Sequence, residues 1–140
     1  MIEQTQPTTQ DIIAVAEFRS ALRHFLRRSE KIARHSGLTP QRYTLLMMIK
    51  GAPDGAEQST VTELSERMQL AQSTVTELVR RAESAGLIER EQSQRDARVA
   101  HLRLTPEGER RLMLSFTELA TERAQLREAF ANFDGGVTGR

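Results

Sequence analysis

The residues with the clearest chemical potential lie on one face of a segment in the middle of the chain. Residues 72–85 carry apolar side chains at the spacing of one buried helix face, namely Val75, Leu78, Val79 and Ala82. The opposite face and its flanks carry polar groups: Gln72, Ser73, Thr74, Thr76, Glu77, Arg80 and Arg81. Short hydroxyl side chains let a helix approach a major-groove floor, an arginine can donate to guanine or phosphate, and a glutamate can accept from a cytosine amine. This face is therefore either a DNA-reading face or an ordinary solvated one.

A second group of candidate residues lies in a predicted β-hairpin directly after this helix. One strand begins at Leu87-Ile88, residues 92–96 form a polar turn, and residues 99–104 alternate between apolar and polar. Residues 90–103 of this hairpin carry four arginines and two acids: Arg90, Arg95, Arg98, Arg103, Glu91 and Asp96. An arginine at a hairpin tip can enter a narrow minor groove, where the negative potential is deepest. Asp96 can hold Arg98 in place, although the pair taken alone also fits a surface salt bridge.

These residues must be positioned by a series of short elements. Apolar periodicity and capping residues predict helices over residues 11–35, 40–50, 60–68, 72–85 and 106–133. We expect Asp11 to cap the first helix, and Thr39 and Thr105 to cap helices that open with a proline. The third and fourth helices are separated by a short break at Gln69-Leu70, which is the layout of a helix-turn-helix.

Two apolar stripes are left without an evident partner in so short a chain. In the last helix, apolar residues follow four-and-three spacing, at Leu112, Phe116, Leu119, Leu126, Phe130 and Phe133. This spacing is typical of a coiled-coil face. The first helix carries a second stripe between Ile12 and Ala33. Both stripes are expected to pack against another surface.

Composition excludes several classes of protein. With 140 residues, 38% hydrophobic and 28% charged, the chain is globular and has room for one domain or two small lobes. Aromatic residues make up only 4%, which argues against stacking platforms for single-stranded nucleic acid. The absence of cysteine excludes a disulfide framework, a thiol nucleophile and a thiolate zinc site. No apolar run approaches the roughly 20 residues of a membrane span and no signal peptide is evident, so we expect a cytoplasmic protein.

Charge is unevenly distributed although the net charge is only +1. Residues 18–36 contain six basic residues against the single acid Glu30, a local charge of +5. Eighteen of the twenty basic residues in the chain are arginine. Arginine suits groove contacts better than lysine does, but codon bias explains this composition equally well.

Catalysis and metal binding find little support. The three histidines, His24, His35 and His101, have no metal-ligand spacing and lie in no nucleophile motif. No glycine-rich phosphate loop is present. We therefore expect no enzyme activity, no cofactor and no metal site.

The hairpin and its flanks resemble a known family. Arg95-Asp96-Ala97-Arg98 is followed, after five residues, by Leu104-Thr105-Pro106-Glu107-Gly108. This pattern is similar to the D-x-R…L-T-x-x-G signature of MarR-type winged-helix regulators. The segments 73–79, 86–90 and 38–43 resemble that family's recognition helix, its G-L-I/V-x-R exit and its second-helix opening. The resemblance covers roughly residues 11–133. Glu77 departs from it, because the family often carries a basic or neutral residue there.

The resemblance implies a mainly α fold with a small β-wing. It assigns residues 38–104 to a winged helix-turn-helix lobe, residues 11–36 and 106–133 to dimerisation helices, and residues 1–10 and 134–140 to flexible ends. The homodimer would bind a pseudo-palindromic operator, with phosphate contacts from Arg90, Arg95 and Arg103. We assign to the dimer interface Ile12, Val15, Leu22, Leu112, Phe116, Leu119, Leu126 and Phe130.

Two further expectations follow from the resemblance. Family members usually repress, and many release DNA when a phenolic or aromatic-carboxylate ligand binds. The ligand-binding candidates in this chain are His24, Arg27, Arg28, Tyr43 and Met47, which are otherwise dimer-interface or solvent-facing groups. The absence of cysteine excludes regulation by thiol oxidation. The competing hypothesis is a winged-helix module that contacts proteins and does not bind DNA.

Overall fold

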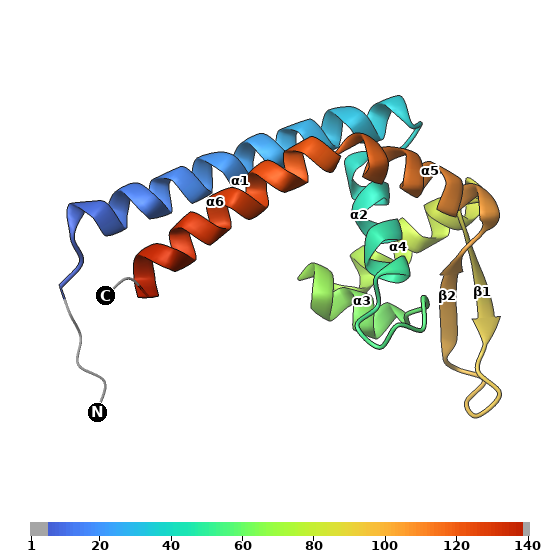
Figure 1. Ribbon diagram of the computed structural model, residues 1–140. Helices are drawn as coiled ribbons and strands as arrows, with labels where there is room; N and C mark the ends of the chain where they lie inside the picture. Colours follow the sequence, from blue (N-terminus) through green and yellow to red (C-terminus); the bar gives the residue numbers. More distant parts are fainter. Residues whose placement is uncertain (1–5, 139–140) are drawn as a thin grey trace. The chain divides into compact units, whose positions relative to one another are not determined.

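The computed structural model describes residues 6–138 and contains six helices and one two-stranded sheet within that range (Figure 1). The chain divides into two compact units. One unit, here called the winged lobe, comprises residues 33–117; the other, here called the helical unit, comprises the described residues up to 32 and from 118 onward. The elements are α1 (Thr9–His35), α2 (Pro40–Lys50), α3 (Val61–Met68), α4 (Gln72–Ser84), β1 (Ile88–Gln92), β2 (Ala100–Leu104), α5 (Pro106–Glu118) and α6 (Ala120–Thr138).

The core of the winged lobe is formed by the buried faces of α2, α3, α4 and the hairpin. Its largest fully buried apolar side chains are Leu45, Leu46, Ile49, Leu64, Val75, Val79, Leu87 and Leu102. A chain this small relies on such a continuous apolar core, because hydrophobic burial is the main favourable term in folding. The core thus holds α4 by one face and leaves its opposite face free of the interior.

The helices of the lobe begin where the sequence places their capping residues. The Thr39 hydroxyl accepts from the Arg42 backbone N–H at 3.1 Å, and Pro40 occupies the first turn. Thr60 and Glu63 form a reciprocal capping box at the start of α3. Gln69 ends α3 in the left-handed conformation, with φ of 56°. The predicted helix-turn-helix limits, 60–68 and 72–85, are confirmed to within one residue by α3 and α4.

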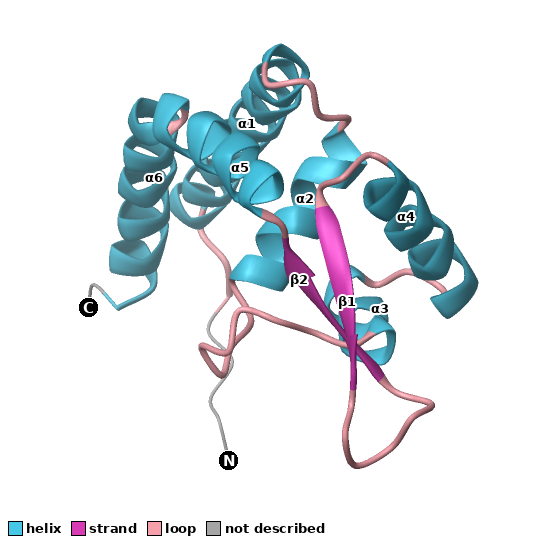
Figure 2. Cartoon of the chain, turned by 90° about the vertical axis from the view of Figure 1, so that its right-hand side faces the viewer, coloured by secondary structure: helices cyan, strands magenta, loops and turns pink. Residues whose placement is uncertain are grey.

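The hairpin projects from the helices of the lobe (Figure 2). Strands β1 and β2 pair antiparallel from Ile88↔Leu104 to Gln92↔Ala100. Ser59, just before α3, adds a short third pairing, because its N–H and C=O bond to the C=O and N–H of Leu102 at 3.0 and 2.8 Å. The base of the hairpin is thereby attached to the start of the helix-turn-helix.

The ends of the hairpin meet at a tight junction between the exit of α4 and the start of α5. The Thr105 hydroxyl donates to the Gly86 carbonyl at 2.6 Å and accepts from the Gly108 N–H at 3.1 Å. The Thr105 N–H donates to the Leu87 carbonyl at 3.0 Å. A Cβ added to Gly108 would lie 2.1 Å from that same carbonyl oxygen, so only glycine permits this approach. The L-T-x-x-G part of the sequence pattern is thus a packing requirement.

Lys50, at the end of α2, joins three parts of the winged lobe. Its Nζ donates to Glu57 Oε1 at 2.7 Å and to Glu109 Oε1 at 2.6 Å. These hydrogen bonds, that to Glu109 first, raise the pKa of Lys50 above its usual value. The contact connects α2 to the loop before α3 and to α5.

In the helical unit, α1 and α6 run antiparallel. Phe18 of α1 contacts two rings of α6, with centroid distances of 5.8 Å to Phe130 and 5.6 Å to Phe133. Farther along, Arg28 Nε donates to Glu122 Oε2 at 3.3 Å. Aromatic contacts at one end and an ion pair at the other thus connect the two helices.

The structure corrects the predicted ends of the first and last helices. The first begins at Thr9, and its cap is Thr8, which exchanges hydrogen bonds with Asp11 at 2.8 and 3.1 Å; the prediction of Asp11 as the N-cap was wrong. The single helix predicted over residues 106–133 is interrupted at Leu119. Apolar spacing does not distinguish one helix from two that are separated by a single residue.

The end of α6 also differs from the prediction. This helix continues to Thr138, through Gly135-Gly136, although these glycines were expected to end it. Glycine lowers helix stability by only about 1 kcal/mol per residue, so it weakens a helix without stopping it. Of the two ends predicted to be flexible, residues 1–5 and 139–140 lie outside the described range. Among residues 6–138, none of the helices has the length and apolarity needed to cross a bilayer.

Replacing Gly108 by alanine is expected to destabilise the protein by about 1–3 kcal/mol, because the new Cβ would overlap the Leu87 carbonyl. In a helix without such a contact, the same change would stabilise by about 0.5–1 kcal/mol. Urea unfolding followed by far-ultraviolet circular dichroism measures the difference. The control is Thr117→Ala at an exposed position of α5, which is expected to leave stability unchanged or slightly raised. A Gly108→Ala protein as stable as the unmodified one would contradict the junction.

Candidate nucleic-acid interface

Helix α4 presents a polar face on the side opposite to its buried stripe. Val75, Leu78, Val79 and Ala82 are buried as predicted, at 8% exposure or less. Six of the seven polar residues predicted for the opposite face are exposed and Glu77 is partly so. The structure therefore brings together on one helix face Gln72, Ser73, Thr74, Thr76, Glu77, Arg80 and Arg81.

The charges on this face are paired with each other. Arg80 Nη2 donates to both carboxylate oxygens of Glu77, at 2.9 Å to Oε1 and closer to Oε2. Arg81 Nε lies 3.7 Å from Glu77 Oε2. The carboxylate thus lies between two guanidinium groups, and the centre of the face carries less positive charge than its two arginines suggest.

The start of α4 leaves backbone donors available. Its N-cap is Ala71, which has no side-chain hydrogen bond to the first turn. Gln72 is connected to the preceding helix, because its Nε2 donates to the hydroxyl of Thr62 at 3.4 Å. Uncapped N–H groups at a helix start favour an anion such as a phosphate, through their hydrogen bonds and the helix dipole.

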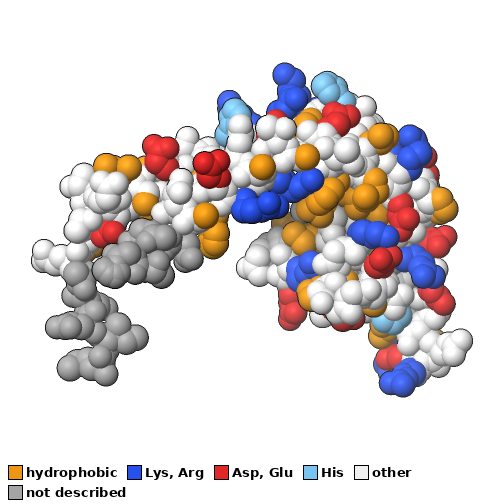
Figure 3. Space-filling model, viewed as in Figure 1, with side chains coloured by type: hydrophobic (Ala, Val, Ile, Leu, Met, Phe, Trp, Pro, Cys, Tyr) orange, Lys and Arg blue, Asp and Glu red, His pale blue; other side chains and the backbone are white. Residues whose placement is uncertain are grey.

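The hairpin tip is ordered by its own short polar side chains. Ser93 Oγ accepts from the backbone N–H groups of Arg95 at 3.2 Å and Asp96 at 3.3 Å. Asp96 Oδ1 accepts from Arg98 twice, from the backbone N–H at 3.0 Å and from Nε at 3.4 Å. The predicted contact of Asp96 with Arg98 is confirmed, and the Arg98 side chain remains 93% exposed. Basic side chains gather at this tip (Figure 3).

The two arginines on the strands have structural partners. Arg90 donates from Nε and Nη2 to the carboxylate of Glu83 at 2.9 and 2.7 Å, which raises the pKa of Arg90 and joins β1 to α4. Arg103 Nη1 donates to Glu91 Oε2 at 3.3 Å across the hairpin. The bidentate geometry makes the first contact specific. Phosphate binding by these two arginines stays a prediction, whereas Arg95 and Arg98 lie at the open tip.

The sequence pattern does not indicate Glu83 as the partner of Arg90. The two residues are separated by the turn at Gly86, where φ is +76°. Their contact requires the strand to fold back along α4, and neither helical nor strand periodicity encodes that direction. Gly86 was the one local signal of this contact, because glycine readily adopts the left-handed conformation in which the chain can reverse its direction after a helix.

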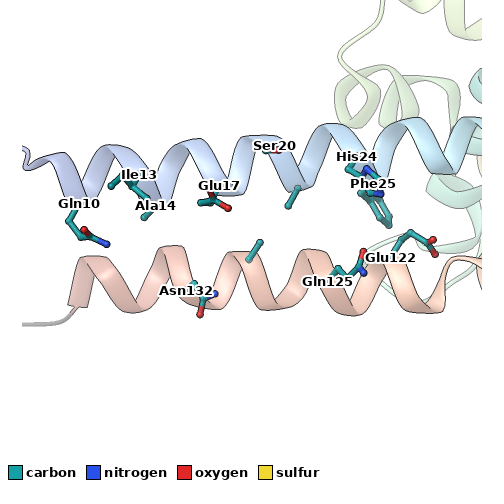
Figure 4. Close-up of a pocket in the computed structure, with 12 residues that line it drawn as sticks. Gln10, Ile13, Ala14, Glu17, Ser20, His24, Phe25, Glu122, Gln125 and Asn132 are labelled. Atoms are coloured by element: carbon teal, nitrogen blue, oxygen red, sulfur yellow. The ribbon is translucent and has the colours of Figure 1, made fainter.

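The predicted ligand-binding residues belong to different units. His24 of α1 lines a hollow of about 500 Å³ between α1 and α6, together with residues such as Glu17, Phe25 and Gln125 (Figure 4). In the winged lobe, Tyr43 is 5% exposed and Met47 is partly buried. Arg27 is exposed, and Arg28 is paired with Glu122. A shared ligand site for the five residues His24, Arg27, Arg28, Tyr43 and Met47 stays a prediction. Among residues 6–138, no cluster of three or more His, Asp or Glu side chains could hold a metal ion.

The predicted dimer residues fall into two classes. The large side chains that are exposed are Ile12 (64%), Val15 (40%), Phe116 (39%) and Phe130 (52%), while Leu22 and Leu126 are partly exposed. In contrast, Leu112 and Leu119 are only 3% and 1% exposed in the single chain. These two leucines contribute to the chain's own interior, so their assignment to a surface for a second copy is corrected.

Comparisons with known proteins connect this geometry to a family. A family model described as the MarR family matches residues 36–99. The chain is 32% identical over 131 residues to YsmB of Bacillus subtilis (strain 168), an uncharacterized HTH-type transcriptional regulator, and the match covers 90% of this chain and 84% of YsmB.

Solved structures agree on the fold. A crystal structure of a MarR family transcription regulator matches with a TM-score of 0.71 and 24% identity, covering 86% of this chain and 77% of that one. A mutant MarR from E. coli complexed with operator DNA matches with a TM-score of 0.64 and 17% identity, covering 91% and 87%. At 24% and 17% sequence identity, these two similarities show a common fold only.

Replacing Asp96 by alanine is expected to loosen the hairpin tip without unfolding the lobe. The Arg98 amide would lose its acceptor, a hydrogen bond of about 0.5–1.5 kcal/mol, so its hydrogen exchange should accelerate roughly three- to tenfold. Residue-resolved amide exchange by NMR measures this, with Arg95→Ala as the control at the same tip. Unchanged exchange at Arg98 would show that the carboxylate does not order the turn.

Proposed function

The chain belongs to the MarR family, and we propose that it is a transcriptional regulator that binds duplex DNA sequence-specifically as a homodimer. The observation that carries the proposal is the combination, in one lobe, of the exposed polar face of α4 and the ordered, arginine-bearing hairpin tip. The MarR structure that contains operator DNA supports it through the shared fold.

Each element of the lobe suits a different groove. A 13-residue helix is about 20 Å long, and its exposed face carries no bulky apolar side chain, so α4 can lie in a major groove. The open N–H groups at Ala71 would bind a phosphate beside that groove. The hairpin tip with Arg95 and Arg98 would enter the adjacent minor groove, where a narrow A·T-rich segment attracts arginine.

A homodimer follows from the exposed apolar side chains and from the size of one lobe. One winged lobe covers one half-site, and two lobes about 34–36 Å apart would read a pseudo-palindrome in successive major grooves. The apolar side chains of Ile12, Val15, Phe116 and Phe130 would be covered by the second copy. Because Arg95 and the other basic groups would neutralise phosphates, affinity should fall steeply with salt.

We further propose that the protein represses and responds to a small anionic ligand. A ligand releases DNA only if it binds the DNA-free arrangement more tightly than the DNA-bound one. Arg27 is exposed on α1 without a charged partner among the described residues and would favour an aromatic carboxylate. Adding benzoate to the protein–DNA complex, with neutral phenol in parallel, tests for release and for the role of charge.

Replacing Arg98 by alanine is expected to weaken binding to DNA from upstream of the protein's own gene by about 1–2 kcal/mol. The loss should come with unchanged helicity and molecular mass, because this side chain is almost fully exposed. Fluorescence anisotropy at several salt concentrations measures the effect, and Arg127→Ala, which removes an exposed arginine from α6, serves as the charge-matched control. Unaltered affinity would contradict insertion of the hairpin tip. Absence of binding by the unmodified protein would favour a protein-contact module instead.

The double substitution Ile12→Ser and Val15→Ser is expected to produce monomers. Both side chains are exposed in the single chain, so their loss leaves the fold intact while it removes apolar area that a second copy would bury. Burial of such side chains stabilises by about 1.5–3 kcal/mol each, so the dimer Kd should rise at least a hundredfold, roughly. Sedimentation velocity measures the mass, with Arg34→Ser on the same helix as control. A persistent dimer would refute this interface.

A further inference from the structure

We propose that Glu77 is a specificity-determining residue that selects cytosine at one position of each half-site, while holding Arg80 for the guanine of that base pair. This inference rests on the proposed function, namely that α4 lies in a major groove.

The position of Glu77 makes it a reading residue rather than a structural one. The core of α4 faces inward through Val75 and Val79, and at 100° per residue Ser73, Glu77 and Arg80 lie opposite them. These three side chains therefore occupy the middle of the exposed face. A DNA groove that receives this face of α4 would therefore contact Glu77.

The ion pair of Glu77 with Arg80 has little structural value. The side chains of Glu77 and Arg80 are 42% and 66% exposed, and an exposed ion pair contributes little to stability because water and salt screen it. Their contact uses Arg80 Nη2, which leaves Nε and Nη1 as donors directed by the same guanidinium plane. The ion pair thus holds the side chain of Arg80 in place and leaves it N–H groups that can bind another acceptor.

The chemistry of a carboxylate restricts the base that Glu77 can face. A carboxylate is an acceptor only, and in the major groove cytosine presents the amine at N4 as a donor. Guanine presents O6 and N7, and thymine presents O4 and a methyl group, so neither offers a hydrogen to Glu77. Adenine offers a hydrogen at N6, but its N7 acceptor lies beside that amine and would repel the second carboxylate oxygen, whereas cytosine has no acceptor there. In a C·G pair the guanine acceptors O6 and N7 lie beside the cytosine amine, and one of the remaining N–H groups of Arg80 can donate to one of them. The pair Glu77–Arg80 is therefore complementary to cytosine and guanine together.

The carboxylate of Glu77 would also penalise wrong sequences. At G·C or T·A in the same position, Glu77 would lose water and face base acceptors while only Arg80 and Arg81 remain beside it, so the desolvation of its carboxylate is not compensated by the base. Near any phosphate it would repel, which lowers affinity for unrelated duplexes. If Glu77 gives specificity by penalising wrong bases, removing its charge should strengthen binding to non-specific duplexes. A residue that gives specificity only through a favourable contact would not have this effect.

The test is a selection from duplexes randomised across the half-site, followed by sequencing. The unmodified protein is expected to enrich cytosine at one position per half-site, by roughly tenfold over guanine or thymine. Glu77→Gln should change the preferred base to adenine, because glutamine can bond to adenine N6 and N7 together. Glu77→Ala should lose the preference at that position and keep the others. Both variants should bind a scrambled duplex more tightly than the unmodified protein.

Controls separate the role of Glu77 from its charge. Glu118→Gln removes the same charge at an exposed position outside the winged lobe and should preserve the cytosine preference. Arg80→Ala should keep cytosine enriched but bind its site more weakly. If Glu77→Gln and Glu77→Ala enrich the same base as the unmodified protein at every position, this inference is overturned while the proposed function stands. If the unmodified protein enriches no sequence, the proposed function itself fails.

Discussion

The close approach of Gly108 to the Leu87 carbonyl is the constraint on which the winged lobe depends. It brings the start of α5 against the exit of α4, and Thr105 completes the junction by bonding to Gly86. Since β1 begins and β2 ends at this junction, the direction in which the hairpin leaves the lobe is set there. The position of the hairpin tip relative to the polar face of α4 is therefore set by the backbone, and it depends on Gly108 having no side chain.

Arginine serves two separate purposes in this lobe. Arg67 donates to the carbonyls of Met48 and Gly51 at the end of α2, and Arg90 joins β1 to α4, so both stabilise the scaffold. Arg95 and Arg98 are carried by a tip whose order comes from Ser93 and Asp96. A count of basic residues cannot separate the two kinds, whereas their partners do. This division explains how a chain with a net charge of +1 can present a local basic surface.

What could be predicted from sequence was mostly local. Thr39-Pro40 and the Thr60…Glu63 box marked helix starts because capping acts over three residues. Asp11 is a good capping residue by type, yet Thr8 lies three residues earlier and forms reciprocal hydrogen bonds with it as the actual cap. Leu112 and Leu119 have the spacing of an interface but are buried in the single chain. Periodicity identifies an apolar face but does not tell which surface that face packs against. The contact of Glu83 with Arg90 depends on chain reversal and lay beyond any local pattern.

The scarcity of lysine, of which Lys50 beside Glu57 and Glu109 is one example, limits how covalent modification can change the charge of the protein. Lys50 is one of only two lysines, the other being the exposed Lys31 of α1, and neither belongs to α4 or to the hairpin. Acetylation, which removes charge from lysine side chains, therefore has no substrate on the two elements that carry the basic surface. The arginines there carry guanidinium groups, so acyl transfer to lysine leaves their charge unchanged.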